Sequence, residues 1–139
     1  MTALTAHALA AFWHEPHVAK LATLNPDGTP HVRPLWYLHD GHDVVLITRP
    51  TTRHVRNIRR DPRVTVCIDR PTAPYAGVVV QGRARLEEVA HQEWAVPLAV
   101  RYLGQDAGAL IGARYAQVDR MTIRLTTDEL TSWDFGPAP

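Results

Sequence analysis

The chain has 139 residues, the size of one ordinary domain, and we expect a single domain over residues 1–139. Hydrophobic residues make up 45% and charged residues 21%, which excludes a disordered chain, and no apolar run approaches the roughly 20 residues that cross a bilayer. The net charge of +1 differs from the basic balance of most nucleic-acid-binding proteins, and a lone cysteine, Cys67, excludes an internal disulfide framework. The first helix-like stretch is too short and too uncharged at its start for a secretory signal, so we expect a cytoplasmic protein.

The first third of the chain predicts a short helix and a three-stranded meander. An amphipathic pattern over 2–13 predicts a helix that is broken near Pro16. Strand patterns follow, separated by short turns, the first of which, Asn25-Pro26-Asp27-Gly28, is a strong turn signal. Short turns join antiparallel neighbours, so this meander excludes a doubly wound parallel sheet. The predicted strands span 17–24, 29–39 and 44–48.

A basic helix is predicted after the meander. A threonine of Pro50-Thr51-Thr52 can cap a helix that runs to about Arg60, and Val55 and Ile58 form its narrow apolar stripe. The helix ends at Asp61-Pro62, because the residue before a proline disfavours helical angles. The rest of the chain predicts strands over 63–69, 77–87, 118–126 and 130–135, and helices over 88–103 and 105–116.

Six or seven mostly antiparallel strands, with helices inserted after the third and the fifth, predict a mainly β fold of the α+β class. We expect the strands to form a closed or nearly closed barrel with helical decorations. Pro97 is expected to kink or divide the predicted helix over 88–103.

Two common kinds of catalytic site are poorly supported. The eight histidines form no His-x3-His pair and no HExxH motif, and only His39 and His42, which flank a turn, could meet, so no metal site is predicted. The only serine, Ser132, lacks a nucleophile elbow, and Cys67 lies within a predicted strand. We therefore expect no side-chain nucleophile and assign no catalytic residue.

The arginines are clustered in a way that predicts an anion site. Six of them fall in the segment 49–63, opposed there only by Asp61. A solvated, capped helix usually carries acidic residues in its first turn, but Arg53 and His54 stand there instead. Free N–H groups at a helix start and guanidinium donors both bind phosphate or carboxylate. His54 and Asn57 are three positions apart and share one face of this helix.

The second predicted strand carries another signal. Pro34 cannot donate a ladder hydrogen bond, so it marks an edge, a bulge or a place where a ligand approaches the backbone. Trp36 lies two residues on and shares a face with Pro34 and Val32. A core tryptophan and a stacking platform for a ligand both fit this pattern.

Four segments, in their order and spacing, carry a resemblance to a known superfamily. They are 21–30, Pro34-Leu-Trp36, 48–64 with its run Arg56-Asn-Ile-Arg-Arg-Asp-Pro-Arg63, and 80–86. They resemble the flavin- and deazaflavin-dependent oxidoreductases of the split β-barrel fold, which include pyridoxamine 5'-phosphate oxidase. The variant with this arginine-rich run commonly uses the deazaflavin coenzyme F420 instead of FMN.

The resemblance implies a split β-barrel of six to seven antiparallel strands, and a homodimer with two cofactor sites at the interface. The family often has a lysine where this chain has His54. The cofactor tail is expected on Arg53, His54 and Asn57; its ring is expected against Pro34, Leu35, Trp36, Ile47 and Thr48; and Tyr75 is expected to close the site from the second copy.

The implied reaction is hydride transfer between reduced F420 and a small unsaturated organic acceptor, with neither nucleic acid nor membrane as a partner. Three alternatives stay open: an FMN enzyme like pyridoxamine 5'-phosphate oxidase, a non-catalytic protein that binds a cofactor or a tetrapyrrole, and a nucleic-acid binder that uses the arginine cluster. The sequence assigns neither the substrate nor a proton donor.

Overall fold

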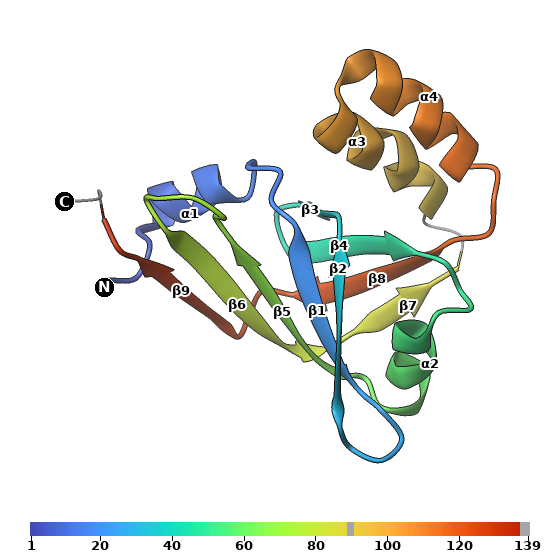
Figure 1. Cartoon of the computed structure of the whole chain (residues 1–139), viewed down its shortest axis with the longest axis horizontal. Helices are drawn as coiled ribbons and strands as arrows, with labels where there is room; N and C mark the ends of the chain where they lie inside the picture. The colour runs from blue at the N-terminus through green and yellow to red at the C-terminus, as the bar shows by residue number, and fades with distance from the viewer. Residues whose placement is uncertain (89–90, 137–139) are drawn as a thin grey trace.

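The computed structural model describes residues 1–88 and 91–136 as strands and four helices (Figure 1). The helices are α1 (Ala6–Phe12), α2 (Arg53–Arg60), α3 (His91–Leu103) and α4 (Gln105–Tyr115). The strands are β1 (Ala19–Leu24), β2 (Pro30–Leu35), β3 (Tyr37–His39), β4 (Asp43–Thr48), β5 (Arg63–Asp69), β6 (Ala76–Arg83), β7 (Arg85–Glu87), β8 (Met121–Thr126) and β9 (Leu130–Asp134). The predicted elements are found at these positions; residues 89–90, in the predicted helix over 88–103, lie outside the described residues.

The described strands form two antiparallel sheets. One sheet has five strands in the order β2-β1-β5-β6-β9, and the other has four in the order β3-β4-β8-β7. Figure 1 shows the sheets facing each other, with α2 at one end and the α3–α4 hairpin projecting at another. This arrangement confirms the predicted mainly β fold with helices after the third and fifth predicted strands.

Two predicted strands pass from one sheet to the other, which explains why the described residues contain nine strands where the sequence predicts six or seven. The predicted strand over 29–39 is divided at Trp36 and that over 77–87 at Ala84. At each bend a backbone N–H leaves the ladder: Tyr37 donates to the Tyr102 hydroxyl at 3.0 Å, and Ala84 donates to the Pro62 carbonyl at 2.8 Å. Such a bend depends on distant partners, so local alternation does not reveal it.

The core lies between the two sheets. Alternate residues of β1 are buried, and the predicted inward positions of β8, Met121, Ile123 and Leu125, are each 1% exposed. Tyr37 and Phe12 are the largest fully buried side chains and close the core beside α1. The apolar faces of the strands therefore explain why this sequence folds into opposed sheets.

Caps and glycines shape the helices. The Thr52 hydroxyl accepts a hydrogen bond from the Val55 amide at the start of α2, as predicted. Pro97 lies inside α3, which is one helix from His91 to Leu103, so of the two expected effects of this proline the division of the helix does not occur. A proline forfeits one helical hydrogen bond, but α4 lies close along α3 there: a Cβ on Gly112 would come within 2.6 Å of the Val96 Cα. The two helices are therefore closely packed beside the proline.

No helix in the described part of the chain combines the length and the apolar character that a membrane crossing requires.

Candidate functional site

An open, mostly apolar cavity of about 330 Å³ lies between β2 of one sheet, β4 of the other sheet and the α3–α4 hairpin. Apolar walls around a few convergent polar groups are typical of small-molecule sites. Four of the five residues that were expected against a cofactor ring line this cavity. The lining residues are Val18, Pro34, Leu35, Trp36, Ile47, Ala95, Leu98, Tyr115 and Arg120.

The strands present these side chains for local reasons. Pro34 lies on β2, an edge strand of the five-stranded sheet, which is where a sheet tolerates a residue without an N–H. Ile47 is the one half-buried position in β4, whose other residues are buried. Pro34 and Ile47 can therefore line the cavity without disrupting the sheet or removing a residue from the core.

Trp36 forms a flat wall of the cavity. Its ring stacks on the Tyr102 ring at a centroid distance of 4.8 Å and an interplanar angle of 4°. The Tyr102 hydroxyl donates to the His17 carbonyl at 2.6 Å and accepts from the Tyr37 amide at 3.0 Å, and burial raises the pKa of this hydroxyl. Tyr102 thus stays protonated and fixes the indole, so Trp36 is a cavity wall and not a core tryptophan.

A second hollow, of about 680 Å³, lies between α2 and the β1–β2 turn and is basic. Arg56 donates to the Thr51 carbonyl at 2.6 Å, and Arg60 donates to the Leu24 carbonyl and to the Asn57 side chain. The lining residues are Asn25, Pro26, Asp27, Thr29, Arg53, Arg56, Asn57 and Arg60.

Arg53 is placed to meet a ligand. Within the described residues no hydrogen bond or ion pair engages its guanidinium, although it stands in the first turn of α2 beside the hollow. A helix start with an unpaired arginine favours phosphate or carboxylate.

His54 and Asn57 share a face of α2, as predicted, but that face is turned into the protein. Each side chain is 2% exposed. The Asn57 amide donates to Thr23 at 3.0 Å and to Asn25 at 3.1 Å, while His54 Nε2 lies 2.7 Å from the Thr48 hydroxyl. Asn57 borders the basic hollow beside Arg53, whereas His54 and Thr48 are buried and do not line it.

The charge of His54 follows from its burial. Burial, with smaller contributions from His31 and Arg33, lowers its pKa to about 4. The imidazole is accordingly neutral near neutral pH. Its neighbours Val55 and Ile58 are core residues, and their apolar stripe is the sequence signal that could have revealed the burial.

Tyr75 lies apart from both hollows. It is 51% exposed, in the segment before β6, and its carbonyl accepts a hydrogen bond from the Phe135 amide. It lines neither the cavity nor the basic hollow in the same chain, so its expected role depends on a second copy.

The α3–α4 side of the cavity was missed by sequence reasoning. Tyr102, Tyr115 and Arg120 fall in a part of the chain that has no recognisable motif. Only the docking of the hairpin on the sheet brings them beside Trp36, and we find no local signal that would have identified them.

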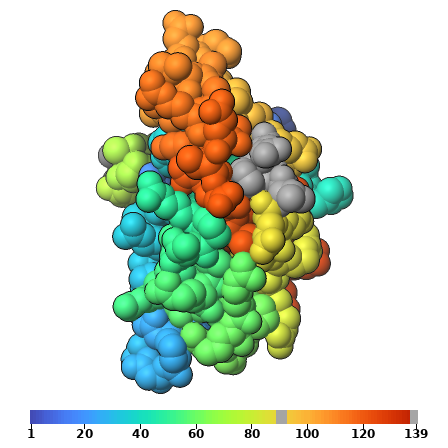
Figure 2. Space-filling model, turned by 90° about the vertical axis from the view of Figure 1, so that its right-hand side faces the viewer, coloured from blue at the N-terminus to red at the C-terminus, as the bar shows by residue number. Residues whose placement is uncertain are grey.

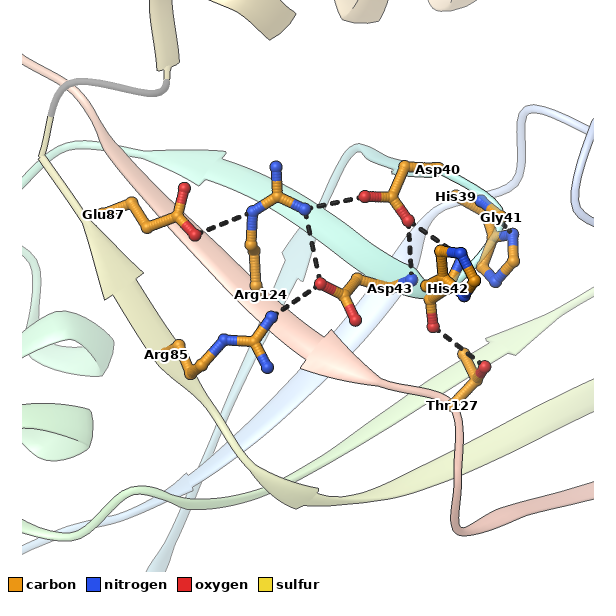
Figure 3. A network of polar contacts seen from close by, with 9 residues as sticks. All are labelled: His39, Asp40, Gly41, His42, Asp43, Arg85, Glu87, Arg124 and Thr127. Carbon is orange, nitrogen blue, oxygen red and sulfur yellow. Dashed lines mark hydrogen bonds and ion pairs between the residues drawn. The ribbon is translucent and has the colours of Figure 1, made fainter.

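A further polar cluster lies on the four-stranded sheet (Figure 3). Arg124 of β8 lies among three carboxylates, 2.7 Å from Asp40, 3.3 Å from Asp43 and 2.9 Å from Glu87. Arg85 of β7 binds Asp43 at 2.7 Å. Charges in this cluster are satisfied by one another, so it joins β4, β7 and β8 and is not a ligand site.

The histidines beside this cluster do not make a metal centre. His39 stacks on the Trp13 ring at 4.2 Å, and burial lowers its pKa. Over residues 1–88 and 91–136, no group of three or more His, Cys, Asp or Glu side chains could hold a metal ion.

The split barrel of this chain is a flavin-type cofactor-binding fold. The chain belongs to the pyridoxamine 5'-phosphate oxidase family, whose sequence model matches residues 5–134. This family contains oxidoreductases, and the match confirms the superfamily expected from the sequence.

Solved structures agree with this assignment. A conserved hypothetical protein from Mycobacterium tuberculosis is 29% identical, with a TM-score of 0.79 over 94% of this chain and 85% of that chain. An F420 reductase is 25% identical, with a TM-score of 0.69 over 86% of this chain and 93% of that chain. An FAD- and heme-binding protein from Mycobacterium smegmatis, 14% identical with a TM-score of 0.76 over 97% and 74% of the two chains, shows the fold alone. No curated protein matches this chain.

Proposed function

We propose that this protein is an F420-dependent oxidoreductase that transfers a hydride between reduced F420 and a small unsaturated organic acceptor. The observation that carries the proposal is the apolar cavity in which Pro34, Trp36 and Ile47, expected against the cofactor ring, come together with Leu35. Similarity to an F420 reductase supports the deazaflavin as the cofactor.

The cavity suits a planar ring system. Trp36, held parallel to Tyr102, offers a flat wall, and Pro34 offers no N–H that would be left unpaired beneath an apolar ring. F420, when bound, supplies the hydride at its deazaflavin ring. The apolar walls can orient the two reactants against each other, which is the protein's contribution to such a reaction.

The basic hollow suits an anionic tail. Arg53 has a free guanidinium there, and the segment 48–52 joins it to Ile47 in the cavity. Figure 2 shows α2 on one face of the molecule, with the α3–α4 hairpin above it and the β1–β2 hairpin below it. We infer that Arg53 contacts the phosphate directly, whereas His54 and Asn57 act from inside by holding Thr48 and the β1–β2 turn.

We also propose that the protein is a homodimer with the cofactor sites at its interface. Val32 on the edge strand β2 is 58% exposed, and Tyr75 and Phe135 are large exposed hydrophobic residues as well. Burial of such residues against a second copy favours association. Light scattering after size exclusion tests the dimer, and a monomer at micromolar concentration would overturn it.

The function is tested by titrating the protein with F420 and, separately, with FMN while tryptophan fluorescence is followed. We expect F420 to bind more tightly and to quench the fluorescence, because Trp36 lines the cavity. Tighter binding of FMN would support the FMN-enzyme alternative instead. Tight F420 binding with no reduction of any acceptor would favour a carrier.

The role of Arg53 is tested in the same assay. The substitution Arg53→Gln should weaken F420 binding by about 1.5–3 kcal/mol, the usual value of a hydrogen bond to a charged group. Arg114→Gln, on the exposed side of α4, is the matched control and should leave the affinity unchanged. Equal affinities for the two variants would remove Arg53 from the site.

A further inference from the structure

The cavity has one charged wall residue that the proposed function does not use. Among the described residues that line it, Arg120 alone carries a charge. Arg120 immediately precedes β8 and is half-buried. It also borders an adjoining hollow of about 270 Å³, formed with Pro50, Glu88, Asp119 and Met121.

The guanidinium of Arg120 lies 4.5 Å from the centre of the Tyr115 ring, over its face. In the part of the chain that the structure describes, no hydrogen bond or ion pair engages it, and its Nε atom is shielded from solvent without a partner. Asp119 is exposed beside it and forms no ion pair with it. Arg124, by contrast, lies among three carboxylates.

An arginine in this state is suited to bind an anion. A cation held over an aromatic ring gains part of the stabilisation it loses by leaving water, but its planar donors remain unused. A carboxylate matches those donors, because two parallel N–H···O hydrogen bonds fit its geometry. Among the other walls, Val18, Leu35 and Leu98 offer apolar contact. The cavity thus combines one anion-binding group with a surface for a flat apolar body.

We propose that the cavity also binds a planar, largely apolar organic acid, beside the place of the cofactor ring, and that Arg120 binds its carboxylate while Tyr115 holds the guanidinium in place. This inference rests on the proposed function in one respect, that the acid is the acceptor of the hydride. Arg53 and the basic hollow lie outside this cavity and would serve the cofactor's phosphate, which leaves Arg120 for the acceptor.

The test measures binding without cofactor, by calorimetric titration at neutral pH with 2-naphthoate and with its uncharged analogue 2-naphthamide. The wild-type protein should bind the carboxylate about tenfold more tightly than the amide, the ratio expected from one charge-assisted hydrogen-bonded contact. Arg120→Gln should reduce this ratio to about one, and Arg120→Lys should retain part of it. Arg114→Gln, on the same hairpin, should leave it at the wild-type value.

Equal affinity of the wild-type protein for both compounds, or saturable binding of neither, would overturn the inference. So would a preference for naphthoate that persists in Arg120→Gln. The F420 titration of the wild-type protein separates the two proposals. If F420 does not bind but the Arg120-dependent preference is present, the acid site stands and the proposed function fails; if F420 binds and the preference is missing, only the acid site fails.

Discussion

Acidification should destabilise this protein through His54, and replacing that residue should remove the effect. The imidazole is 2% exposed, and Nε2 lies 2.7 Å from the Thr48 hydroxyl. Burial lowers its pKa to about 4, and the nearby His31 ring and Arg33 guanidinium act in the same direction. His54 is therefore neutral in the folded protein over most of the pH range in which a free histidine gains a proton.

The sign and size of the effect follow from proton binding. In the unfolded chain the pKa is 6.5, so below that value the unfolded state binds a proton that the folded state does not. The stability that His54 contributes is complete above a pH of about 6.5 and is lost as the pH falls toward about 4. Since a tenfold difference in proton affinity between the two states is worth about 1.4 kcal/mol, the loss amounts to about 3 kcal/mol in the free energy of unfolding.

The assay is urea unfolding of the wild-type protein and of His54→Gln between about pH 7 and about pH 4. The difference between their free energies of unfolding isolates His54, because the other titrating groups are common to both. We expect this difference to move by about 3 kcal/mol in favour of the variant as the pH falls. His7→Gln, at an exposed position of α1, should follow the wild-type curve. Parallel curves for wild type and His54→Gln would refute the reasoning.

Two further predictions concern the α3–α4 hairpin. Tyr102→Phe leaves the Tyr37 amide without its acceptor and should lower the free energy of unfolding by about 1–3 kcal/mol in urea. Tyr75→Phe removes a hydroxyl that forms no hydrogen bond within the described residues and should not lower it. Equal stability of the two variants would contradict the anchoring role of Tyr102. Gly108→Ala places a Cβ against the Val100 backbone and should lower the melting temperature. Alanine has a helix propensity roughly 1 kcal/mol better than glycine. If the melting temperature rises instead of falling, the two helices can move apart at no cost in stability.

Local patterns were sufficient for most of the secondary structure. The Asn25–Gly28 turn, the alternation of 77–87 and the Thr52 cap each act within a few residues, so they are readable in one sequence. For Pro34 and Trp36 the local pattern left a core tryptophan and a stacking platform open, and it was the family resemblance that placed both residues against a cofactor ring.

The remainder depends on how distant segments dock. Helical spacing shows that His54 and Asn57 share a face, but only packing on the barrel turns that face inward and leaves Arg53 outside. Trp36 became a cavity wall because Tyr102 stacks on it from α3. Periodicity records which residues lie together on one element, whereas the burial and pKa of a side chain depend on what another element places against it. Arg120 lines the cavity only because distant elements pack together there, so no local pattern could have assigned it to the cavity.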